Sequence, residues 1–221
     1  MSETRFFIKG PMPEVPRQDY FIGLDCGQAQ DFSALSILRR QGGRYEVVHL
    51  ERLALDMPYP QQIEYLFRIM HRKPLDKANV TLAVDYTGVG RPVVDLAQDR
   101  GLRPIGIAIT GGNNVSWNED KTRASVPKRD LIAGLQIAAQ NDRLKVAGSL
   151  KFGPVLAEEL AGFKVKIDPR TAHDSYGSWR EGAHDDLILA TAIGLWVAEY
   201  RDQPKPVFRA ISHGGRRTFF A

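Results

Sequence analysis

The feature that most constrains this chain is a helix-length run that is apolar on nearly all of its faces. The run is GAHDDLILATAIGLWVAE, residues 182–199, and it carries no charge between its second aspartate and its final glutamate. A helix that is hydrophobic all round has to be buried by other elements. Its longest apolar segment, residues 187–198, is too short to cross a bilayer, which takes about 20 residues. The sequence therefore predicts a core helix whose first turn carries two adjacent carboxylates, Asp185 and Asp186.

The N-terminal part of the chain has the pattern of an antiparallel meander. Residues 20–25, 33–40 and 45–53 are short segments rich in β-branched or aromatic side chains, and the turn residues QGGR separate the last two. Strands joined by such short turns pair antiparallel. We therefore expect three sequential strands in one sheet.

The chain then changes from hairpin connections to helical ones. Residues 60–72 carry apolar side chains at helical spacing, and residues 79–85 form an almost continuous apolar strand that suits a sheet covered on both faces. Helices over 90–101 and 126–140 are predicted on either side of a strand over 103–110. The whole pattern indicates a mixed α/β sheet with helices on its faces.

We expect one domain between two extended ends. Residues 1–18 are a proline-rich lead-in, residues 19–201 form the α/β domain, and residues 202–221 form a basic tail. Hydrophobic residues make up 43% of the chain, which is enough to bury a core. The single cysteine, Cys26, excludes an internal disulfide, and the N-terminus lacks the apolar core of a signal peptide. These features favour an intracellular protein without a membrane span.

Two of the predicted strands run from apolar residues directly into an aspartate. Asp25 ends the first strand in GLDCG, and Asp85 ends the fourth in VDYTGVG. Ligands of open α/β sheets bind outside the carboxyl ends of the strands, so these carboxylates can converge if the strands are neighbours. Asp185 and Asp186, at the start of the last helix, would supply a third element. The sequence thus predicts a cluster of three or four carboxylates at one edge of the sheet.

Such a cluster favours divalent cations. Carboxylates that converge with no lysine or arginine between them repel one another, and divalent cations remove that cost. Oxygen ligands suit Mg²⁺ or Mn²⁺, and a pair of these ions can activate water and stabilise the leaving oxygen in phosphodiester cleavage.

Each aspartate also has a purely structural interpretation. Asp25 or Asp85 alone could form a turn after its strand, and a single aspartate at the helix start could cap the helix. A second adjacent carboxylate on an apolar helix has no such structural need. Asp31 follows Asp25 by six residues and could approach the cluster from the hairpin, although a plain turn role is equally consistent with its position.

A group of basic residues surrounds the segment GGNNVSWNEDKTRAS, which has the composition of a loop. Lys121 and Arg123 lie within it, and Lys128 and Arg129 open the helix that follows. They could contact backbone phosphates of a nucleic acid, or they could belong to a solvated helix start. Trp117 in the same segment could stack on a base or attach the loop to the domain.

Four segments together resemble a known family. They are GLDCGQAQDFSALSIL, LAVDYTGVG, VPKRDLI and EGAHDDLILATAIGLWVAE, in this order and spacing. They resemble the nuclease domain of large terminase subunits, the DNA-packaging enzymes of tailed bacteriophages, over about residues 19–200. The resemblance implies a ribonuclease H-like fold, with a mixed central sheet of five or more strands, the first three antiparallel, and helices on both faces.

The resemblance also implies roles for the aspartates. Asp25 and Asp85 would be metal ligands, and the doublet Asp185 and Asp186 would supply the third ligand, with Asp186 preferred as the direct one. The site would hold two Mg²⁺ or Mn²⁺ ions. His184 would contact the metal ligands without binding the metal, or would transfer protons. It could equally be only a polar residue at the helix start.

The function implied by the resemblance is two-metal-ion cleavage of concatemeric double-stranded viral DNA during genome packaging, in the cytoplasm of the infected or lysogenic bacterial host. The expected partners are double-stranded DNA, a terminase ATPase domain or chain, the small terminase subunit and the portal, with no membrane. The chain contains no G-x-x-x-x-G-K-[ST] motif, so we expect no ATP hydrolysis by a phosphate loop of this kind.

Other functions share the same residues. The domain could be a non-catalytic module for DNA binding or assembly. It could be a branched-DNA resolvase or a ribonuclease H, although the VDYTGVG and HDD segments are closer to the terminase pattern. GLDCG could also be the phosphate loop of a sugar-kinase-like or actin-like ATPase, but those proteins need two such domains and usually exceed the 221 residues of this chain.

Overall fold

The computed structural model describes residues 17–27, 31–167, 174–178 and 185–202. The described elements, in chain order, are β1 (Asp19–Asp25), β2 (Ala34–Gln41), β3 (Arg44–Arg52), α1 (Tyr59–Met70), the short helix η1 (Leu75–Lys77), β4 (Asn79–Asp85), α2 (Gly90–Asp99), β5 (Ile105–Thr110), β6 (Ser116–Trp117), β7 (Arg123–Pro127), α3 (Lys128–Gln140), β8 (Leu144–Val146), α4 (Gly153–Gly162), β9 (Phe163–Ile167), β10 (Asp174–Ser178) and α5 (Asp186–Asp202). Almost all of the predicted lead-in and tail lies outside the described residues, as does His184.

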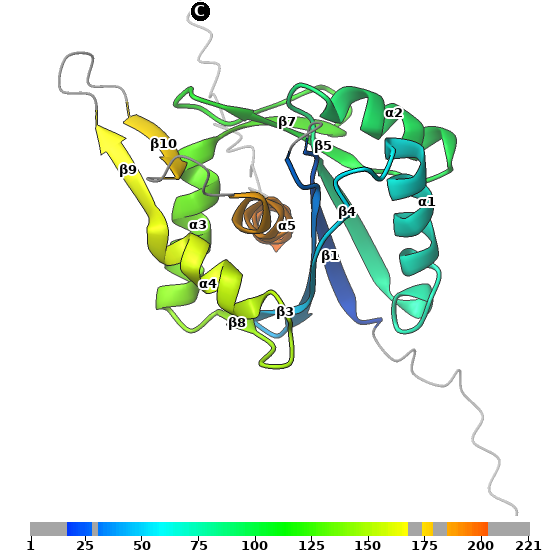
Figure 1. The fold of residues 1–221 in the computed structure, drawn as a ribbon, viewed down its shortest axis with the longest axis horizontal. Helices are drawn as coiled ribbons and strands as arrows, with labels where there is room; N and C mark the ends of the chain where they lie inside the picture. The colour runs from blue at the N-terminus through cyan, green and yellow to red at the C-terminus, as the bar shows by residue number, and fades with distance from the viewer. Residues whose placement is uncertain (1–16, 28–30, 168–173, 179–184, 203–221) are drawn as a thin grey trace, which may run out of the picture.

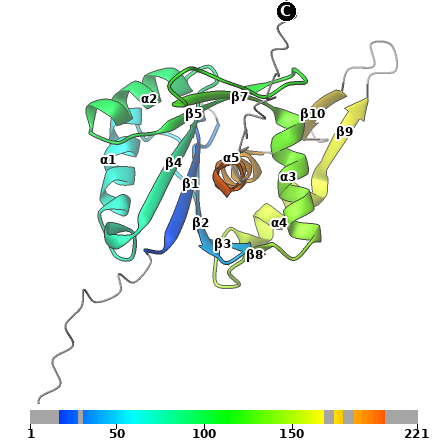
Figure 2. The ribbon, with the colours of Figure 1, turned by 180° about the vertical axis from the view of Figure 1, so that it is seen from behind.

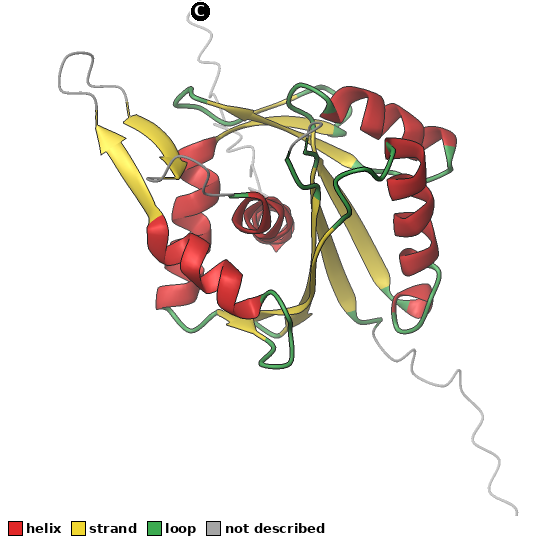
Figure 3. Cartoon of the chain, in the orientation of Figure 1, coloured by secondary structure: helices red, strands yellow, loops and turns green. Residues whose placement is uncertain are grey.

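The centre of the fold is an eight-stranded mixed sheet in the order β6-β7-β5-β4-β1-β2-β3-β8 (Figures 1 and 3). β1, β2 and β3 pair antiparallel, while β4 lies parallel beside β1. Both features confirm the predicted mixed sheet with an antiparallel start. Because β1 and β4 are parallel neighbours, their carboxyl ends lie at the same edge of the sheet.

Helices cover both faces of the sheet, as predicted. α5 lies between the sheet and the helices α3 and α4, whereas α1 and α2 cover the opposite face (Figures 1 and 2). The alternation of β1 explains how one strand serves two cores. Tyr20, Ile22 and Leu24 pack into the core beneath α1 and α2, while Phe21 packs into the core around α5.

The predicted core helix is buried along nearly its whole length. Residues 186–195 of α5 are all buried, in agreement with the apolar pattern. Beyond the first turn, the polar side chain of Thr191 is also buried. It donates to the carbonyl of Leu187 at 2.8 Å and lies 3.0 Å from the hydroxyl of Ser36 on β2. The helix is thus attached to the sheet by packing and by a hydroxyl contact.

α5 approaches β1 unusually closely. A Cβ atom added at Gly23 of β1 would lie 1.9 Å from the carbonyl oxygen of Ala190 and 2.9 Å from the amide nitrogen of Gly194, both on α5. A Cβ added at Gly194 would in turn lie 3.2 Å from the amide nitrogen of Gly23. Backbone therefore meets backbone here, and only glycine fits at the strand position.

Several elements differ from the sequence prediction. The segment interpreted as a loop after β5 contains β6 and β7, which extend the sheet by two strands. The prediction was wrong there because the ring of Trp117 packs on Trp196 and Tyr200 of α5, a tertiary contact that holds this polar hairpin in place. Among the helices that the structure describes, none combines the length and the apolar character needed to cross a bilayer.

The close approach of α5 predicts that Gly23→Ala destabilises the protein strongly. The added methyl group must displace α5 because the atoms it meets belong to backbone, and overpacking of this kind costs about 1–3 kcal/mol or more. Gly134→Ala in α3 is the matched control, since nothing lies within 4 Å of its added Cβ. We expect the control to stabilise the helix by about 0.5–1 kcal/mol. Urea unfolding of the two variants measures both effects, and equal stabilities would contradict the packing argument.

Candidate functional site

All four predicted aspartates line one pocket of about 340 Å³ at the carboxyl edge of the sheet, and Asp31 lines it as well. Asp25 comes from the end of β1 and Asp85 from the end of β4, while Asp185 and Asp186 lie at the start of α5. The structure therefore brings together residues that are up to 161 positions apart, from 25 to 186.

The segment after β4 is shaped by its glycines to hold Asp85 in place. Gly88 has a positive φ of 56°, which favours glycine. A Cβ atom at Gly90 would lie 1.8 Å from the carbonyl oxygen of Asp85, so α2 begins directly against the strand end. The amide of Thr87 donates to Oδ1 of Asp85 at 2.8 Å, and the Thr87 hydroxyl accepts from the amide of Ile109 at 2.9 Å. The motif VDYTGVG thus fixes one carboxylate at the sheet edge.

The first two carboxylates are buried and repel one another. Asp25 is 9% exposed and Asp85 is 8% exposed. Burial raises the pKa of Asp25 well above its ordinary value, and the negative charges of Asp85 and Asp185 raise it further. Burial also raises the pKa of Asp85, although hydrogen bonds from Thr87 oppose this. Without a compensating cation, the pair therefore favours holding a proton.

The two carboxylates of the doublet have basic partners. The ammonium group of Lys128 donates a hydrogen bond to Oδ2 of Asp185 at 2.7 Å. Arg52 donates two hydrogen bonds to Asp186, one from Nε to Oδ2 at 2.8 Å and one from Nη2 to Oδ1 at 2.9 Å. The expectation of a cluster without lysine or arginine is therefore wrong for the doublet. The strand β3 ends with Arg52 at this edge of the sheet, and the helix α3 begins with Lys128 there.

Arg52 and Glu159 are site residues that the sequence analysis missed. Nη2 of Arg52 also donates to Oε1 of Glu159 at 2.7 Å, and the amide of Ile188 in α5 donates to Oε2 at 2.9 Å. Burial raises the pKa of Glu159 to about 7. Arg52 ends β3 and could have been found by the strand-end argument that identified Asp25, since β3 runs in the same direction as β1. No local signal marks Glu159, which caps α5 from another helix.

The donor chemistry of the pocket fits a divalent cation of the Mg²⁺ or Mn²⁺ type. The donors nearest one another, Asp25 and Asp85, are carboxylates, whose oxygens these ions prefer. A cation would also offset the burial that raises the pKa of both carboxyls and the repulsion that further raises the pKa of Asp25. As placed, Asp185 and Asp186 bond to Lys128 and Arg52, and within the described ranges no three acidic, histidine or cysteine side chains form a ready ligand set.

The four basic residues proposed to contact nucleic acid fall at different places. Lys128 pairs with Asp185 in the pocket, and Arg129 donates to the carbonyl of Asn113 at 3.2 Å. Lys121 lies 5.7 Å above the ring centroid of Trp117. Arg123 lies on β7 rather than in a loop.

Trp117 attaches its hairpin to the domain. Its ring centroid lies 5.7 Å from that of Trp196 and 4.6 Å from that of Tyr200, both on α5. Trp117 could have stacked on a base or attached this segment to the domain, and the structure shows the second role.

Comparison with known proteins identifies the fold. No protein-family model and no curated protein sequence matches this chain. The chain is similar to the solved large terminase nuclease of thermophilic phage G20c with bound magnesium, at 20% identity and a TM-score of 0.61, over 84% of this chain and 82% of that one. It is also similar to the g2p (large terminase) nuclease domain of bacteriophage SPP1 with bound Mn, at 12% identity and a TM-score of 0.52, over 81% of this chain and 86% of that one.

A longer protein also contains this fold. The large terminase of another thermophilic bacteriophage matches 85% of this chain with 41% of its own length, at 14% identity and a TM-score of 0.58. A further structure of that longer terminase is in complex with ADP. These likenesses show that the chain has the ribonuclease H-like fold of terminase nuclease domains, as the sequence resemblance implied.

The Arg52 cluster predicts that Arg52→Gln destabilises the protein by about 3–5 kcal/mol, because it leaves the buried carboxylates of Asp186 and Glu159 without their charged partner. Arg39→Gln is the matched control. It breaks another arginine–glutamate pair, between β2 and β3, whose side chains are 34% and 30% exposed. Such an exposed pair contributes at most about 1 kcal/mol. Chemical unfolding at pH 7 should separate the two variants, and an equal loss would show that the Arg52 cluster stabilises no more than a surface pair.

Proposed function

We propose that this protein is a metal-dependent endonuclease of the large terminase type, which hydrolyses phosphodiester bonds of double-stranded DNA with two divalent ions. The observation that carries the proposal is the convergence of Asp25, Asp85 and the Asp185–Asp186 doublet in one pocket of a ribonuclease H-like fold. The magnesium and manganese named in the G20c and SPP1 structures support the choice of Mg²⁺ or Mn²⁺.

The residues of the chain have separate roles in this proposal. Asp25 and Asp85 would hold the ions, which when bound supply activation of water and stabilisation of the leaving oxygen. Thr87 keeps Asp85 oriented through its backbone amide. Lys128, which is paired with Asp185, would add a positive charge near a substrate phosphate bound in the pocket.

We further propose Asp185, rather than the Asp186 preferred from the sequence, as the third direct ligand. Asp186 has a side chain that is 8% exposed, and Arg52 bonds both of its oxygens. The Asp185 side chain is 31% exposed, and Lys128 bonds one of its oxygens. Asp185 also acts more strongly than Asp186 on the pKa of Asp25. Asp186 then serves to fix the first turn of α5.

The solved structure of a longer large terminase supports a proposal about partners. The longer large terminase is more than twice the length of its segment that matches this chain, and one of its structures contains ADP. We propose that this nuclease acts with a terminase ATPase domain or chain, and with a small terminase subunit and a portal, in the cytoplasm of a bacterial host. Lys121 and Arg129 remain proposed contacts to the DNA backbone.

One observation favours a second candidate function. The ion pairs of Asp185 and Asp186 occupy both carboxylates of the doublet with basic side chains. A domain that only binds DNA or assembles with the packaging machinery could keep these pairs permanently.

Cleavage of a supercoiled plasmid tests the proposed function. With Mn²⁺ or Mg²⁺ we expect the parent protein to nick and linearise the circle, and Asp25→Asn and Asp85→Asn to lose roughly 100-fold or more in rate. The ions supply several kcal/mol of transition-state stabilisation, and each 1.36 kcal/mol is about tenfold in rate. Asp76→Asn, on the exposed side of η1, is the control and should cut at the parent rate. Binding of the plasmid without cleavage by the parent would favour the second candidate function.

Metal-dependent thermal stability distinguishes Asp185 from Asp186. At Mn²⁺ about 100 times above Kd, we expect the Tm of the parent to rise by about 5–10 °C, because ligand binding then stabilises by roughly 2.7 kcal/mol. Asp185→Asn should lose most of this rise, whereas Asp186→Asn should keep it, since an asparagine can still accept from Arg52. Loss of the rise in Asp186→Asn alone would restore the assignment preferred from the sequence.

A further inference from the structure

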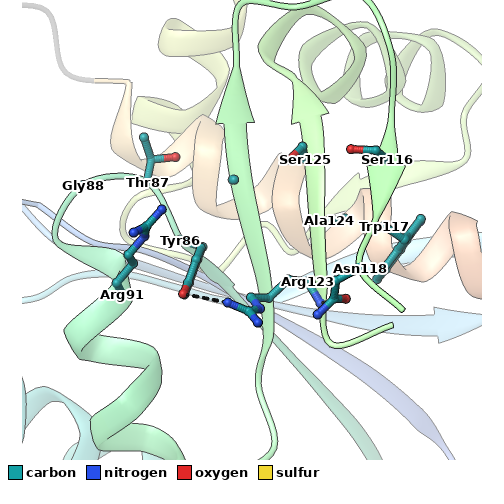
Figure 4. Close-up of a pocket in the computed structure, with 11 residues that line it drawn as sticks. Tyr86, Thr87, Gly88, Arg91, Ser116, Trp117, Asn118, Arg123, Ala124 and Ser125 are labelled. Atoms are coloured by element: carbon teal, nitrogen blue, oxygen red, sulfur yellow. Dashed lines mark hydrogen bonds between the residues drawn. The ribbon is translucent and has the colours of Figure 1, made fainter. Parts of the chain in front are cut away.

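A second pocket lies directly beside the carboxylate pocket. Thr87 and Gly88 line both pockets, so the two are neighbours on either side of the segment that follows Asp85. The second pocket has a volume of about 660 Å³. Figure 4 shows the start of α2 and the end of β4 on one side of it and the β6–β7 hairpin on the other.

Two arginines share one aromatic ring in this pocket. The guanidinium carbon of Arg91 lies 5.4 Å from the ring centroid of Tyr86, and that of Arg123 lies 5.5 Å from it. Nη1 of Arg123 also donates to the Tyr86 hydroxyl at 3.1 Å (Figure 4). In the part of the chain that the structure describes, neither arginine lies within ion-pair distance of a carboxylate. Arg123 does lie close enough to Asp120 for its charge to add to the hydrogen bonds from Thr122 that lower the pKa of that carboxyl. Because neither guanidinium is bonded to a carboxylate, both can bind an anion.

The strand beneath the ring is shaped to receive it. A Cβ atom at Gly106 of β5 would lie 3.1 Å from Cδ2 of Tyr86 and 3.2 Å from Cγ of Arg123. The absence of a side chain at this position lets the ring and the arginine stem lie against the sheet. Tyr86 and Arg123 are thus positioned by the backbone, which lowers the entropy cost of binding a ligand.

The surroundings of the carboxylate pocket are asymmetric in charge. On the side away from Tyr86, a third pocket shares Gly27 and Asp31 with the carboxylate pocket. Its lining includes the carboxylates of Asp31 and Asp56, and the lining residues that the structure describes include no lysine or arginine. A polyanionic strand that leaves the carboxylate pocket therefore meets repulsion on this side and attraction at the arginines on the other.

We propose that Arg91, Tyr86 and Arg123 form a binding site for a backbone phosphate of the DNA strand that is cut, next to the phosphodiester in the carboxylate pocket. The inference rests on the proposed function, and it adds a pocket and the residues Arg91 and Tyr86 to the contact expected at Arg123. Guanidinium groups bind phosphate oxygens through paired N–H donors, and a phosphate carries no base identity. The site therefore positions the strand without selecting a sequence.

DNA binding by a cleavage-deficient protein tests the site. The full chain with Asp25→Asn is titrated against a fluorescein-labelled duplex of about 30 base pairs at several salt concentrations, alone and with Arg91→Gln, Arg123→Gln or both. Each arginine is exposed, so its replacement should leave the Tm unchanged. We expect each replacement to reduce the slope of log K against log salt by about 1, and the double replacement by about 2.

Two further variants serve as controls. Arg44→Gln removes an exposed arginine at the start of β3, the end of that strand opposite to Arg52 and the carboxylate pocket, and should leave the slope unchanged. Replacement of both pocket arginines by lysine should restore most of the slope, because the charge returns. In the cleavage-competent protein, the double glutamine variant should raise KM about tenfold with kcat unchanged, as expected of positioning residues.

The outcomes separate this inference from the proposed function. If the glutamine variants bind DNA with the affinity and slope of their parent, or if the parent binds no DNA, the phosphate site is overturned. If the parent cuts no plasmid but the glutamine variants lose DNA affinity, the phosphate site stands and only the catalytic proposal fails. If the double variant cuts with unchanged KM, the catalytic proposal stands and the phosphate site is overturned.

Discussion

The contact between α5 and Gly23 of β1 is the constraint on which the rest of the structure depends. From Ala190 back to Asp186 the helix rises about 6 Å, at roughly 1.5 Å per residue. From Gly23 forward to Asp25 the strand rises about 6.6 Å, at roughly 3.3 Å per residue. Since the two segments meet at Gly23, their carboxylates reach the sheet edge at about the same height. A backbone contact in the core thereby aligns the carboxylate at the start of α5 with the carboxylate at the end of β1.

The site that results balances buried charge rather than avoiding it. Asp25 and Asp85 are buried beside each other and repel, so they favour a proton or a cation. Asp186 lies beside them but is neutralised by Arg52, which also holds Glu159. The two halves have different consequences. The neutralised half stabilises the start of α5. In the proposed function, the unbalanced half would supply the attraction for divalent ions and, through them, for a phosphodiester.

The periodic parts of the fold were predictable because their burial follows local spacing. The alternation of β1 and the continuous apolar run of β4 identify strands, and the apolar α5 identifies a core helix. The hairpin of β6 and β7 was not predictable, because its polar sequence has no strand pattern and its place depends on Trp117 packing against α5. Glu159 was likewise hidden, since it is one of two adjacent glutamates on α4 and nothing in their local spacing marks it as a cap for another helix.

The amino-acid sequence by itself determined which carboxylates come to the edge of the sheet. Strands that end in Asp25 and Asp85, and a buried helix that begins at the doublet, leave little freedom in where these residues lie. Only the tertiary structure decided what each carboxylate of the doublet does. Arg52 and Asp186 are 134 residues apart, and Lys128 and Asp185 are 57 apart. Such pairs depend on distances between side chains of separate elements. The spacing of residues along one strand or helix gives no information about these distances.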